Sequence, residues 1–265
     1  MVDLLGDFHR AGGREMRLKA LVGLGELLGI PGPTMRVTLA RFRERGWFDV
    51  SKEGRESIYS FSPSAHTALQ DGGRRIHRPA GAAWSGDWST VIYTVPESDR
   101  QTREELRKRL VWLGFGPLAP ATWIRPKPHL DDVAHAAASL PSAKLTMLTS
   151  RTSGLAADRE LAARCWDLDT LATDYELFVR QLRLDLPRYE QVADAPESAF
   201  VERVRLVHRY RALSRHDPQF PVELQPAGWQ GEEARELFER AHSLLRETTS
   251  RFYRDMLPAT PVSLY

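Results

Sequence analysis

Cysteine and long apolar runs are scarce in this chain of 265 residues, and each shortage excludes a class of protein. Cys165 is the only cysteine, so neither an intrachain disulfide nor a metal site built from several thiolates can form. No uncharged apolar run approaches the roughly 20 residues that a membrane-spanning helix needs. Near the N-terminus, Asp3 and Asp7 interrupt the apolar run, whereas a secretory signal requires an uninterrupted apolar core. We therefore expect a soluble, cytoplasmic protein.

The signatures of common enzymes are missing as well. The sequence contains no glycine-rich phosphate loop, no nucleophile elbow and no zinc-type spacing of cysteine and histidine. A catalytic interpretation has no chemical centre, because each of these reactions needs its reacting groups at a defined spacing. We expect that the protein is not an enzyme and that it uses neither a cofactor nor a metal ion.

The formal net charge of +2 hides a difference between the two ends of the chain. Residues 1–80 contain 13 lysines and arginines against 9 aspartates and glutamates, a balance of +4, so the remaining residues carry a balance of −2. A mildly basic N-terminal segment is compatible with a polyanionic partner such as nucleic acid, and equally with an ordinary solvated surface. The spacing of residues has to distinguish these two interpretations.

Two helices joined by a short turn are predicted in the N-terminal segment. Apolar residues recur at helical intervals between residues 18 and 30, and Gly29 ends this pattern. The sequence "PGP" then makes a tight turn, and Pro33 and Thr34 are suited to start a second helix. Steps of four and three predict that the core face of this second helix consists of Met35, Leu39 and Phe42.

The opposite face of the second helix carries small or cationic residues, namely Thr34, Arg36, Val37, Ala40 and Arg41. Two helices with a short Gly/Pro turn fit helix-turn-helix geometry, in which exposed residues early in the second helix meet base edges. The guanidinium group of arginine is the donor fork that best matches guanine in the major groove. We therefore predict that this face enters the major groove of duplex DNA.

A β-hairpin is predicted to follow the second helix. Two β-rich runs, "WFDVS" and "ESIYSF", flank the sequence "KEGR" after Gly46. The hairpin tip presents Lys52 and Arg55, where a wing would meet phosphate groups. The order of helix, turn, helix and hairpin predicts a winged helix-turn-helix domain in residues 1–78 that binds DNA. The alternative is a small α/β module that uses the same core for protein contact.

Residues 79–153 are predicted to form a second domain of strands and helices. Strands are expected in "STVIYTVP", "ATWIRP" and "AKLTMLTS", with amphipathic helices between them. The order β-α-β-α-β, with room for one more strand near Arg125, is typical of a ferredoxin-like α/β sandwich. Strand patterns stop after Asp158, and residues 154–265 are predicted to form an all-α C-terminal domain. The whole chain is thus expected to be an α+β multidomain protein.

The C-terminal segment contains a cationic and aromatic cluster. An apolar line at steps of four and three is continued by Arg211, with His208 nearby in sequence and Trp229 beyond the helix. Such residues could hold the phosphate groups of a thioester ligand while an aromatic wall takes its apolar acyl group. Alternatively, Arg211 only neutralises Asp217 or Glu223. Trp229 would then be an ordinary core residue.

Three blocks of sequence carry a resemblance to a known family: "RVTLARFRERGW" with "GRESIYSF", "WSGDWSTVIYTVPESDRQTREELRKRLVWLGFGPLAPATWIRP", and "VHRYRALSRHDPQFPVELQPAGWQG". They lie in all three expected domains and resemble the PaaX family, the bacterial repressors of phenylacetic acid catabolism. The resemblance implies a transcriptional repressor in which Arg36 and Arg41 are the recognition-helix arginines and Gly54 with Arg55 forms the wing tip.

The resemblance also implies a small-molecule effector. This effector would be an aryl-CoA or other acyl-CoA thioester such as phenylacetyl-CoA, bound through His208, Arg211 and Trp229, that releases the repressor from its operon. A single winged helix contacts only a short half-site, so we expect a homodimer that reads an inverted repeat in double-stranded DNA.

The middle domain is similar, in addition, to the small CRISPR-associated endoribonucleases, whose first strand ends in a metal-binding aspartate. The matching position is Thr94, which lacks the carboxylate that a divalent ion needs. We therefore expect a structural, dimer-forming role for this domain. Two alternatives to the repressor stay open, a metal-dependent nuclease and a winged-helix protein-interaction scaffold.

Overall fold

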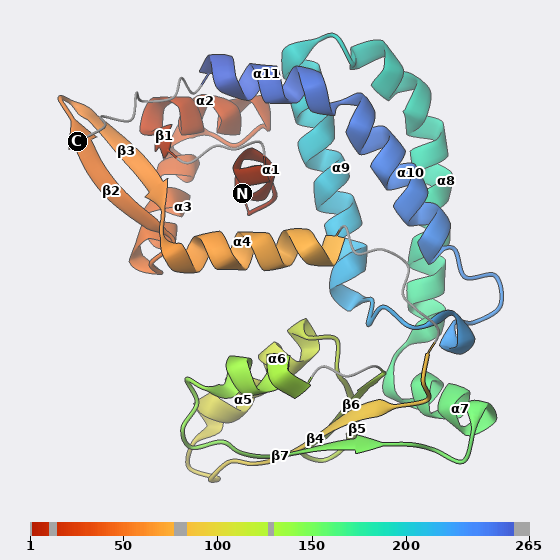
Figure 1. Ribbon diagram of the computed structural model, residues 1–265. Helices are drawn as coiled ribbons and strands as arrows, with labels where there is room; N and C mark the ends of the chain where they lie inside the picture. Colours follow the sequence, from red (N-terminus) through yellow and green to blue (C-terminus); the bar gives the residue numbers. More distant parts are fainter. Residues whose placement is uncertain (1, 11–14, 77–83, 127–129, 257–265) are drawn as a thin grey trace. The chain divides into compact units, whose positions relative to one another are not determined.

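A computed structural model describes residues 2–10, 15–76, 84–126 and 130–256 of the chain (Figure 1). These residues form a mixed α/β protein with eleven α-helices and two small antiparallel sheets. The chain divides into two compact units. The first unit comprises Met1–Arg78, Gln181–Tyr210 and Arg235–Tyr265, and the second comprises Pro79–Arg180 and Arg211–Ala234. The domain boundary expected at residues 78 and 79 lies outside the described residues.

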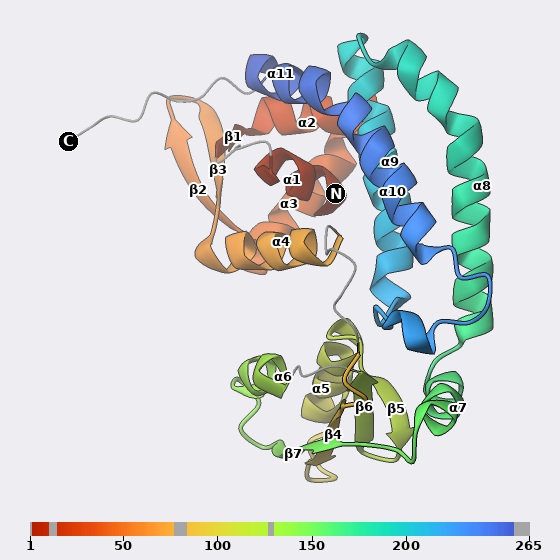
Figure 2. The same cartoon turned by 45° about the vertical axis from the view of Figure 1, so that its right-hand side comes forward.

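The N-terminal part of the first unit contains four helices and a three-stranded sheet. In chain order its elements are α1 (Val2–Arg10), β1 (Glu15–Arg17), α2 (Leu18–Leu27), α3 (Gly32–Glu44), β2 (Phe48–Glu53), β3 (Glu56–Phe61) and α4 (Pro63–Ile76). The sheet is antiparallel with the strand order β1-β3-β2. Figure 1 and Figure 2 both show α1 between α2 and α4.

The predicted pair of helices and the turn between them are present as α2 and α3. Gly29 follows α2 with a φ of +78°, in the left-handed region that glycine adopts without strain. Pro33 lies in the first turn of α3, where its fixed φ suits a helix start. Gly25 lets the two helices approach closely, since a Cβ there would lie 3.2 Å from the Met35 side chain. Met35 and Leu39 are fully buried, as predicted.

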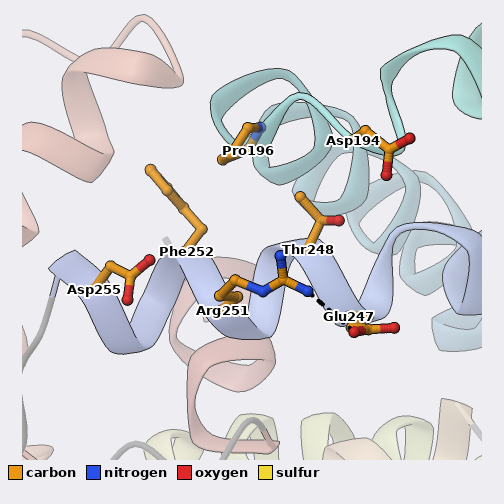
Figure 3. A pocket seen from close by; sticks show the side chains of 7 residues that line it. All are labelled: Asp194, Pro196, Glu247, Thr248, Arg251, Phe252 and Asp255. Atoms are coloured by element: carbon orange, nitrogen blue, oxygen red, sulfur yellow. Dashed lines mark hydrogen bonds and ion pairs between the residues drawn. The ribbon is translucent and has the colours of Figure 1, made fainter.

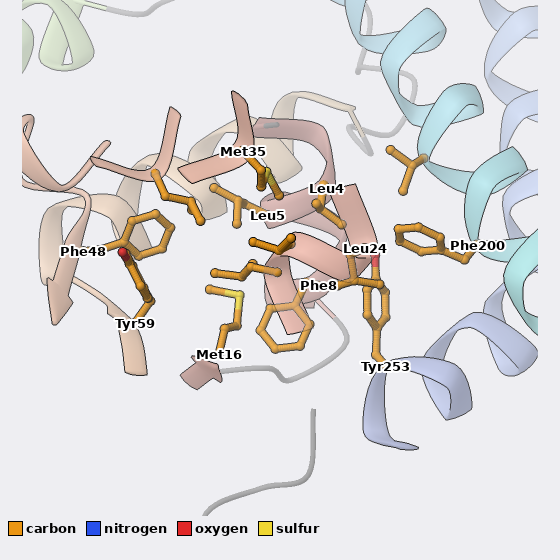
Figure 4. Close-up of a cluster of buried hydrophobic side chains, with 14 residues drawn as sticks. Leu4, Leu5, Phe8, Met16, Leu24, Met35, Phe48, Tyr59, Phe200 and Tyr253 are labelled. Carbon is orange, nitrogen blue, oxygen red and sulfur yellow. The ribbon is translucent and has the colours of Figure 1, made fainter. Parts of the chain in front are cut away.

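The core of the first unit joins segments that are far apart in the sequence (Figure 4). Leu4, Leu5 and Phe8 of α1 are buried together with apolar residues of α2, α3 and the sheet. The C-terminal helices α9 (Pro196–His216) and α11 (Arg246–Met256) contribute Phe200 and Tyr253 to the same core. The ring of Tyr253 lies 5.4 Å from that of Phe8 and 5.7 Å from that of Phe200. The core around α1 therefore combines the N-terminal elements with two helices, α9 and α11, from the C-terminal part of the chain.

The second unit contains a four-stranded antiparallel sheet with two helices. Its elements are β4 (Trp88–Thr94), α5 (Arg100–Trp112), β5 (Gly116–Ala119), β6 (Thr122–Pro126), α6 (Leu130–Ala137) and β7 (Lys144–Ser150). The strand order β5-β6-β4-β7 and the chain order β-α-β-β-α-β are those of a ferredoxin-like arrangement. The additional strand that the sequence left room for is β5, which ends six residues before Arg125.

Trp88 anchors one end of this sheet. Its side chain is completely buried, and its indole N–H donates a hydrogen bond of 2.7 Å to Asp158. The Thr152 hydroxyl donates to the same carboxylate oxygen at 2.6 Å, and the ring of Trp166 stacks on Trp88 with 6.3 Å between centroids. These contacts attach the helix that contains Asp158 to β4.

The segment after the second sheet is helical in the described residues, as predicted. It contains α7 (Leu155–Cys165), α8 (Leu168–Val192), α9, the short 3-10 helix η1 (Val222–Leu224), α10 (Gly231–Leu244) and α11. Residues of α8, α9 and α10 belong to both units, so these helices do not form a separate third unit in this division. None of the described helices is both long and apolar enough to cross a lipid bilayer.

Candidate nucleic-acid interface

The exposed face of α3 contains the residues that the sequence pattern selected. Thr34, Arg36, Val37 and Arg41 are exposed, and Ala40 is half-buried. Val37 leaves 53% of its surface in solvent although it is apolar. An arginine beside a small apolar side chain is suited to base edges, because guanine offers two acceptors and thymine offers a methyl group.

The cationic side chains from α3 to the tip of the following hairpin have no partners within the described part of the chain. All of them are exposed, and none forms a side-chain hydrogen bond or ion pair there: Arg36, Arg41, Arg43, Arg45, Lys52 and Arg55. Arg43 and Arg45 were not among the predicted DNA-binding residues, although they lie two and four residues after Arg41. A group of guanidinium and ammonium charges without internal partners is available to neutralise phosphates.

The hairpin of β2 and β3 has the tight turn that its sequence predicts. Glu53 lies directly opposite Glu56, which leaves Gly54 and Arg55 as the two turn residues. Gly54 has a φ of +61°, which the first position of such a turn requires and which glycine adopts without strain. Lys52 and Arg55 are both exposed at this tip.

One cation at the hairpin was missed by the sequence analysis. Arg17 of β1 donates a hydrogen bond of 2.7 Å from Nη1 to Glu56 and another of 3.1 Å from Nη2 to Glu53. β1 has three residues, which is too short for an alternating pattern to be recognised. The sequence offers no local signal for this strand, because Met16 and Arg17 are both good helix formers that directly precede a helical pattern.

Two aspartates of α1 connect this region to α9. Arg203 Nε donates to both carboxylate oxygens of Asp7, at 2.8 and 3.0 Å, and both side chains are buried. The hydroxyl of Tyr253 donates to the same carboxylate at 3.2 Å. One turn earlier in α1, Asp3 lies 2.8 Å from Nδ1 of His208. Thus α9 is attached to α1 by a buried ion pair and by a second, more exposed contact.

The three residues predicted to bind an effector have separate surroundings. His208 contacts Asp3 in the first unit, whereas Arg211 and Trp229 belong to the second unit. Arg211 is half-buried and has an interaction of its own. Trp229 packs edge-on against Tyr175 with 5.0 Å between ring centroids. The joint role of the three residues as an effector site stays a prediction.

Two residues beside these candidates, Tyr175 and Arg209, each form a hydrogen bond with an aspartate. The Tyr175 hydroxyl donates to Asp217 at 2.7 Å. The tyrosine ring that contacts Trp229 is therefore fixed by a hydrogen bond of its own. Arg209, next to His208 in sequence, donates to Asp185 at 2.8 Å. Burial opposes ionisation of Asp185, but the hydrogen bonds from Arg209 and Gln181 outweigh it and lower the pKa of that carboxyl group. The charge of Arg209 is therefore compensated within the first unit.

A cavity of about 320 Å³ lies between α11 and the beginning of α9 (Figure 3). It is lined by Asp194, Pro196, Glu247, Thr248, Arg251, Phe252 and Asp255. Arg251 is its only cationic side chain and donates to Glu247 at 3.1 Å. Carboxylates outnumber cations in the lining, so this cavity does not suit a ligand that carries several phosphate groups.

Comparison with known proteins identifies the family. Residues 1–65 match the description "PaaX-like protein", residues 81–162 match "PaaX protein central Cas2-like domain", and residues 166–255 match "PaaX-like protein C-terminal domain". The transcriptional repressor PaaX of Escherichia coli (strain K12) is 34% identical over 244 residues, which cover 88% of this chain and 75% of that protein. The chain belongs to the PaaX family.

A solved structure has the same overall fold along most of its length. The uncharacterized protein Rv0674 from Mycobacterium tuberculosis superimposes with a TM-score of 0.59 and 25% sequence identity. The alignment covers 94% of this PaaX-family chain and 96% of the solved chain.

The Cas2-like part of a PaaX-family chain raises the question of a nuclease centre. Thr94, at the position of the expected metal ligand, is exposed at the end of β4. Asp99, the nearest carboxylate in sequence, caps α5 by accepting from the Thr102 backbone N–H at 3.0 Å and from the Ser142 hydroxyl at 2.6 Å. These two hydrogen bonds lower the pKa of Asp99, and the bond from Ser142 has the larger effect. In the described residues no three potential ligands are grouped so that they could hold a metal ion.

Proposed function

We propose that this PaaX-family protein is a transcriptional repressor of a catabolic operon for aromatic compounds of the phenylacetate type. Its N-terminal residues would form a winged helix-turn-helix domain that binds operator DNA. The Escherichia coli relative is by name a transcriptional repressor. A repressor acts at the chromosome, so in a bacterium it would work in the cytoplasm.

One observation carries this proposal: the segment from α3 to the tip of the β2–β3 hairpin carries six exposed cationic side chains that have no partner within the described residues. Elsewhere in the first unit, cations such as Arg203 and Arg209 are paired with carboxylates. A group of charges left without internal partners is most easily explained by an external polyanion.

The arrangement assigns a different role to each element. α3 would lie in the major groove, where Arg36 and Arg41 donate to guanine and Val37 touches a thymine methyl group. The hairpin would lie against the backbone, where Lys52 and Arg55 contact phosphates without reading sequence. Thr34 and Ala40 would allow the helix to approach the bases closely.

We propose that the repressor acts as a homodimer on an inverted repeat, because one α3 reads only a short half-site. Light scattering of the free protein and of its operator complex tests this. A single molecule per duplex at saturating protein would contradict the dimer.

The effector we propose is an acyl-CoA thioester, with phenylacetyl-CoA as the first candidate from the family resemblance. Such a ligand combines several phosphate charges with an apolar acyl group. Arg211 offers a cationic group, His208 offers an imidazole that can hydrogen-bond a phosphate, and Trp229 offers an aromatic surface. The ligand would release DNA by favouring a form of the dimer whose two α3 helices no longer match the spacing of the half-sites.

We propose that the protein is a regulator without catalytic activity. Thr94 lacks a metal-binding carboxylate, and both oxygens of Asp99 already accept hydrogen bonds. Neither residue therefore favours a nuclease.

The decisive experiment is a titration of the promoter region that precedes the gene's own operon, with fluorescence anisotropy as the readout. We expect specific binding that weakens steeply with salt, because phosphate contacts release counterions. A matched duplex with scrambled sequence provides the control. Equal affinity for both duplexes would contradict an operator-specific repressor, and binding to neither at low salt would leave a protein-interaction scaffold as the better interpretation.

A further inference from the structure

The tip of the β2–β3 hairpin carries as many acidic as basic side chains. Lys52 and Arg55 are balanced by Glu53 and Glu56, so the tip has no net charge of its own. A neutral tip gains little from approaching DNA, because the favourable part of such an approach is the neutralisation of phosphates by excess positive charge. The two glutamates would instead bring negative charge close to the phosphates, where like charges repel.

Arg17 adds a positive charge to this tip from the neighbouring strand. β1 pairs with β3, and Arg17 lies opposite Ile58, two residues from Glu56 on the same face of the sheet. From there its guanidinium group reaches Glu56 at 2.7 Å and Glu53 at 3.1 Å. The tip together with Arg17 has three positive groups against two negative groups.

The position of the two glutamates explains why one arginine can serve both. Glu53 and Glu56 are direct cross-strand partners, and two carboxylates in such a position repel each other. The planar fork of a guanidinium group can donate to both at once, whereas a lysine ammonium acts as a single point charge. All three side chains are between 39% and 53% exposed, so the ion pairs add little to stability in water.

We propose that Arg17 is a positioning residue for DNA binding. It holds Glu53 and Glu56 away from the phosphates and compensates their charge, so that Lys52 and Arg55 can contact the backbone. This inference rests on the proposed function, because it concerns the hairpin as a DNA-binding wing. It assigns to β1, a strand with no direct role in reading bases, a part in the electrostatics of the interface.

The test compares Arg17→Ala in two backgrounds, wild type and Glu53→Gln with Glu56→Gln, on a random-sequence duplex at low salt. Contacts of the wing to phosphates are independent of sequence, so no operator is needed. In the wild-type background, Arg17→Ala should weaken binding by roughly threefold to tenfold and flatten the dependence of log Kd on log salt. In the double-glutamine background the same change should have little effect. Arg17→Lys should fall between the two, since it keeps the charge and loses the fork.

The possible outcomes separate three explanations. If Arg17→Ala costs the same in both backgrounds, Arg17 contacts a phosphate itself and the positioning role is wrong. If Arg17→Ala binds like the wild type, Arg17 has no role in the interface. If the wild type binds no duplex at all, the proposed function fails and this inference fails with it.

Thermal melting of each variant identifies an effect on folding. Should Arg17→Ala unfold at the assay temperature, Arg17→Lys carries the comparison instead. Its loss of affinity has to disappear in the double-glutamine background, and a loss that persists there refutes the proposal.

Discussion

Arg203 Nε donates to both oxygens of the Asp7 carboxylate, at 2.8 and 3.0 Å, although the two residues are 196 positions apart in the chain. Asp7 is completely buried and Arg203 is 4% exposed. His242 Nε2 lies 3.5 Å from the same carboxylate, and the carbonyl oxygen of His242 lies 3.5 Å from Arg203 Nη1. The contact between the N-terminal helix and α9 therefore includes a buried ion pair within the core of the first unit.

Removal of one member of this pair should be strongly destabilising. Asp7→Ala leaves the Arg203 charge buried without its carboxylate, which costs on the order of 3–5 kcal/mol. The double variant Asp7→Ala with Arg203→Met should lose less than the sum of the two single variants, because it leaves no buried charge. Urea unfolding measures all three. The exposed pair Glu247 and Arg251 is the matched control, and Glu247→Gln should change stability by less than about 1 kcal/mol. Additive losses at Asp7 and Arg203 would show that they are not coupled.

Arginines of α3 and of the hairpin should differ in what they contribute to DNA binding. Arg36→Ala or Arg41→Ala should abolish preference for the operator, at a cost on the order of 1–3 kcal/mol for each lost base contact. Arg55→Ala should weaken all sequences alike and reduce the salt slope by about one. Lys108→Ala, on the exposed surface of α5, is the control. The assignment of α3 to the major groove fails if Arg36→Ala weakens operator and scrambled DNA equally.

An acyl-CoA thioester should release the protein from its operator. A tenfold loss of DNA affinity requires a coupling free energy of about 1.4 kcal/mol between the two sites. Phenylacetyl-CoA is titrated against the operator complex, with free CoA and phenylacetate as controls. If no member of a panel of acyl-CoA thioesters changes DNA affinity or melting temperature, the effector hypothesis is wrong.

The assignment of effector residues is tested separately. Arg211→Ala should respond to the thioester only at higher concentration, whereas Arg180→Ala, an exposed arginine of α8, should respond like the wild type. A normal response of Arg211→Ala would disprove the assignment of this residue to the site. It would not contradict the hypothesis that a thioester is the effector.

No nuclease activity is expected, because Thr94 cannot supply the carboxylate that a divalent ion needs at that position. RNA and DNA are incubated with the protein in magnesium and in manganese. Cleavage that survives repurification and disappears in Asp99→Asn would overturn this expectation, since Asp99 is the nearest carboxylate that could substitute.

Local patterns were sufficient to predict α2, the turn, α3 and the hairpin, and also three of the four strands of the second sheet. Each of these elements shows its own period or its own turn residues over a short stretch of sequence. The exposed face of α3 could be predicted for the same reason, since it follows from which residues are buried on the opposite side.

Contacts between distant segments could not be predicted in this way. α1 was not expected, because its nine residues are too few for a helical period to be recognised. The partners of its Asp3 and Asp7, His208 and Arg203, lie about 200 residues further along. Arg17 was missed because its two glutamates are on two other strands, Glu53 on β2 and Glu56 on β3. The sharing of α8, α9 and α10 between two units likewise depends on long-range packing, which no local period records.

The core shared by α1, α9 and α11 cannot be completed until most of the chain has been synthesised. Residues 1–78 leave the ribosome first, yet Phe200 and Tyr253, which complete the core around Leu4 and Phe8, are translated only much later. At about 5–20 residues per second, this delay is on the order of ten seconds. During that time the nascent chain carries an unfinished apolar surface, which is a binding site for chaperones. Expression of the N-terminal residues alone would make that exposure permanent, so a fragment of this kind would have to be redesigned at Leu4 and Phe8 before it remained in solution.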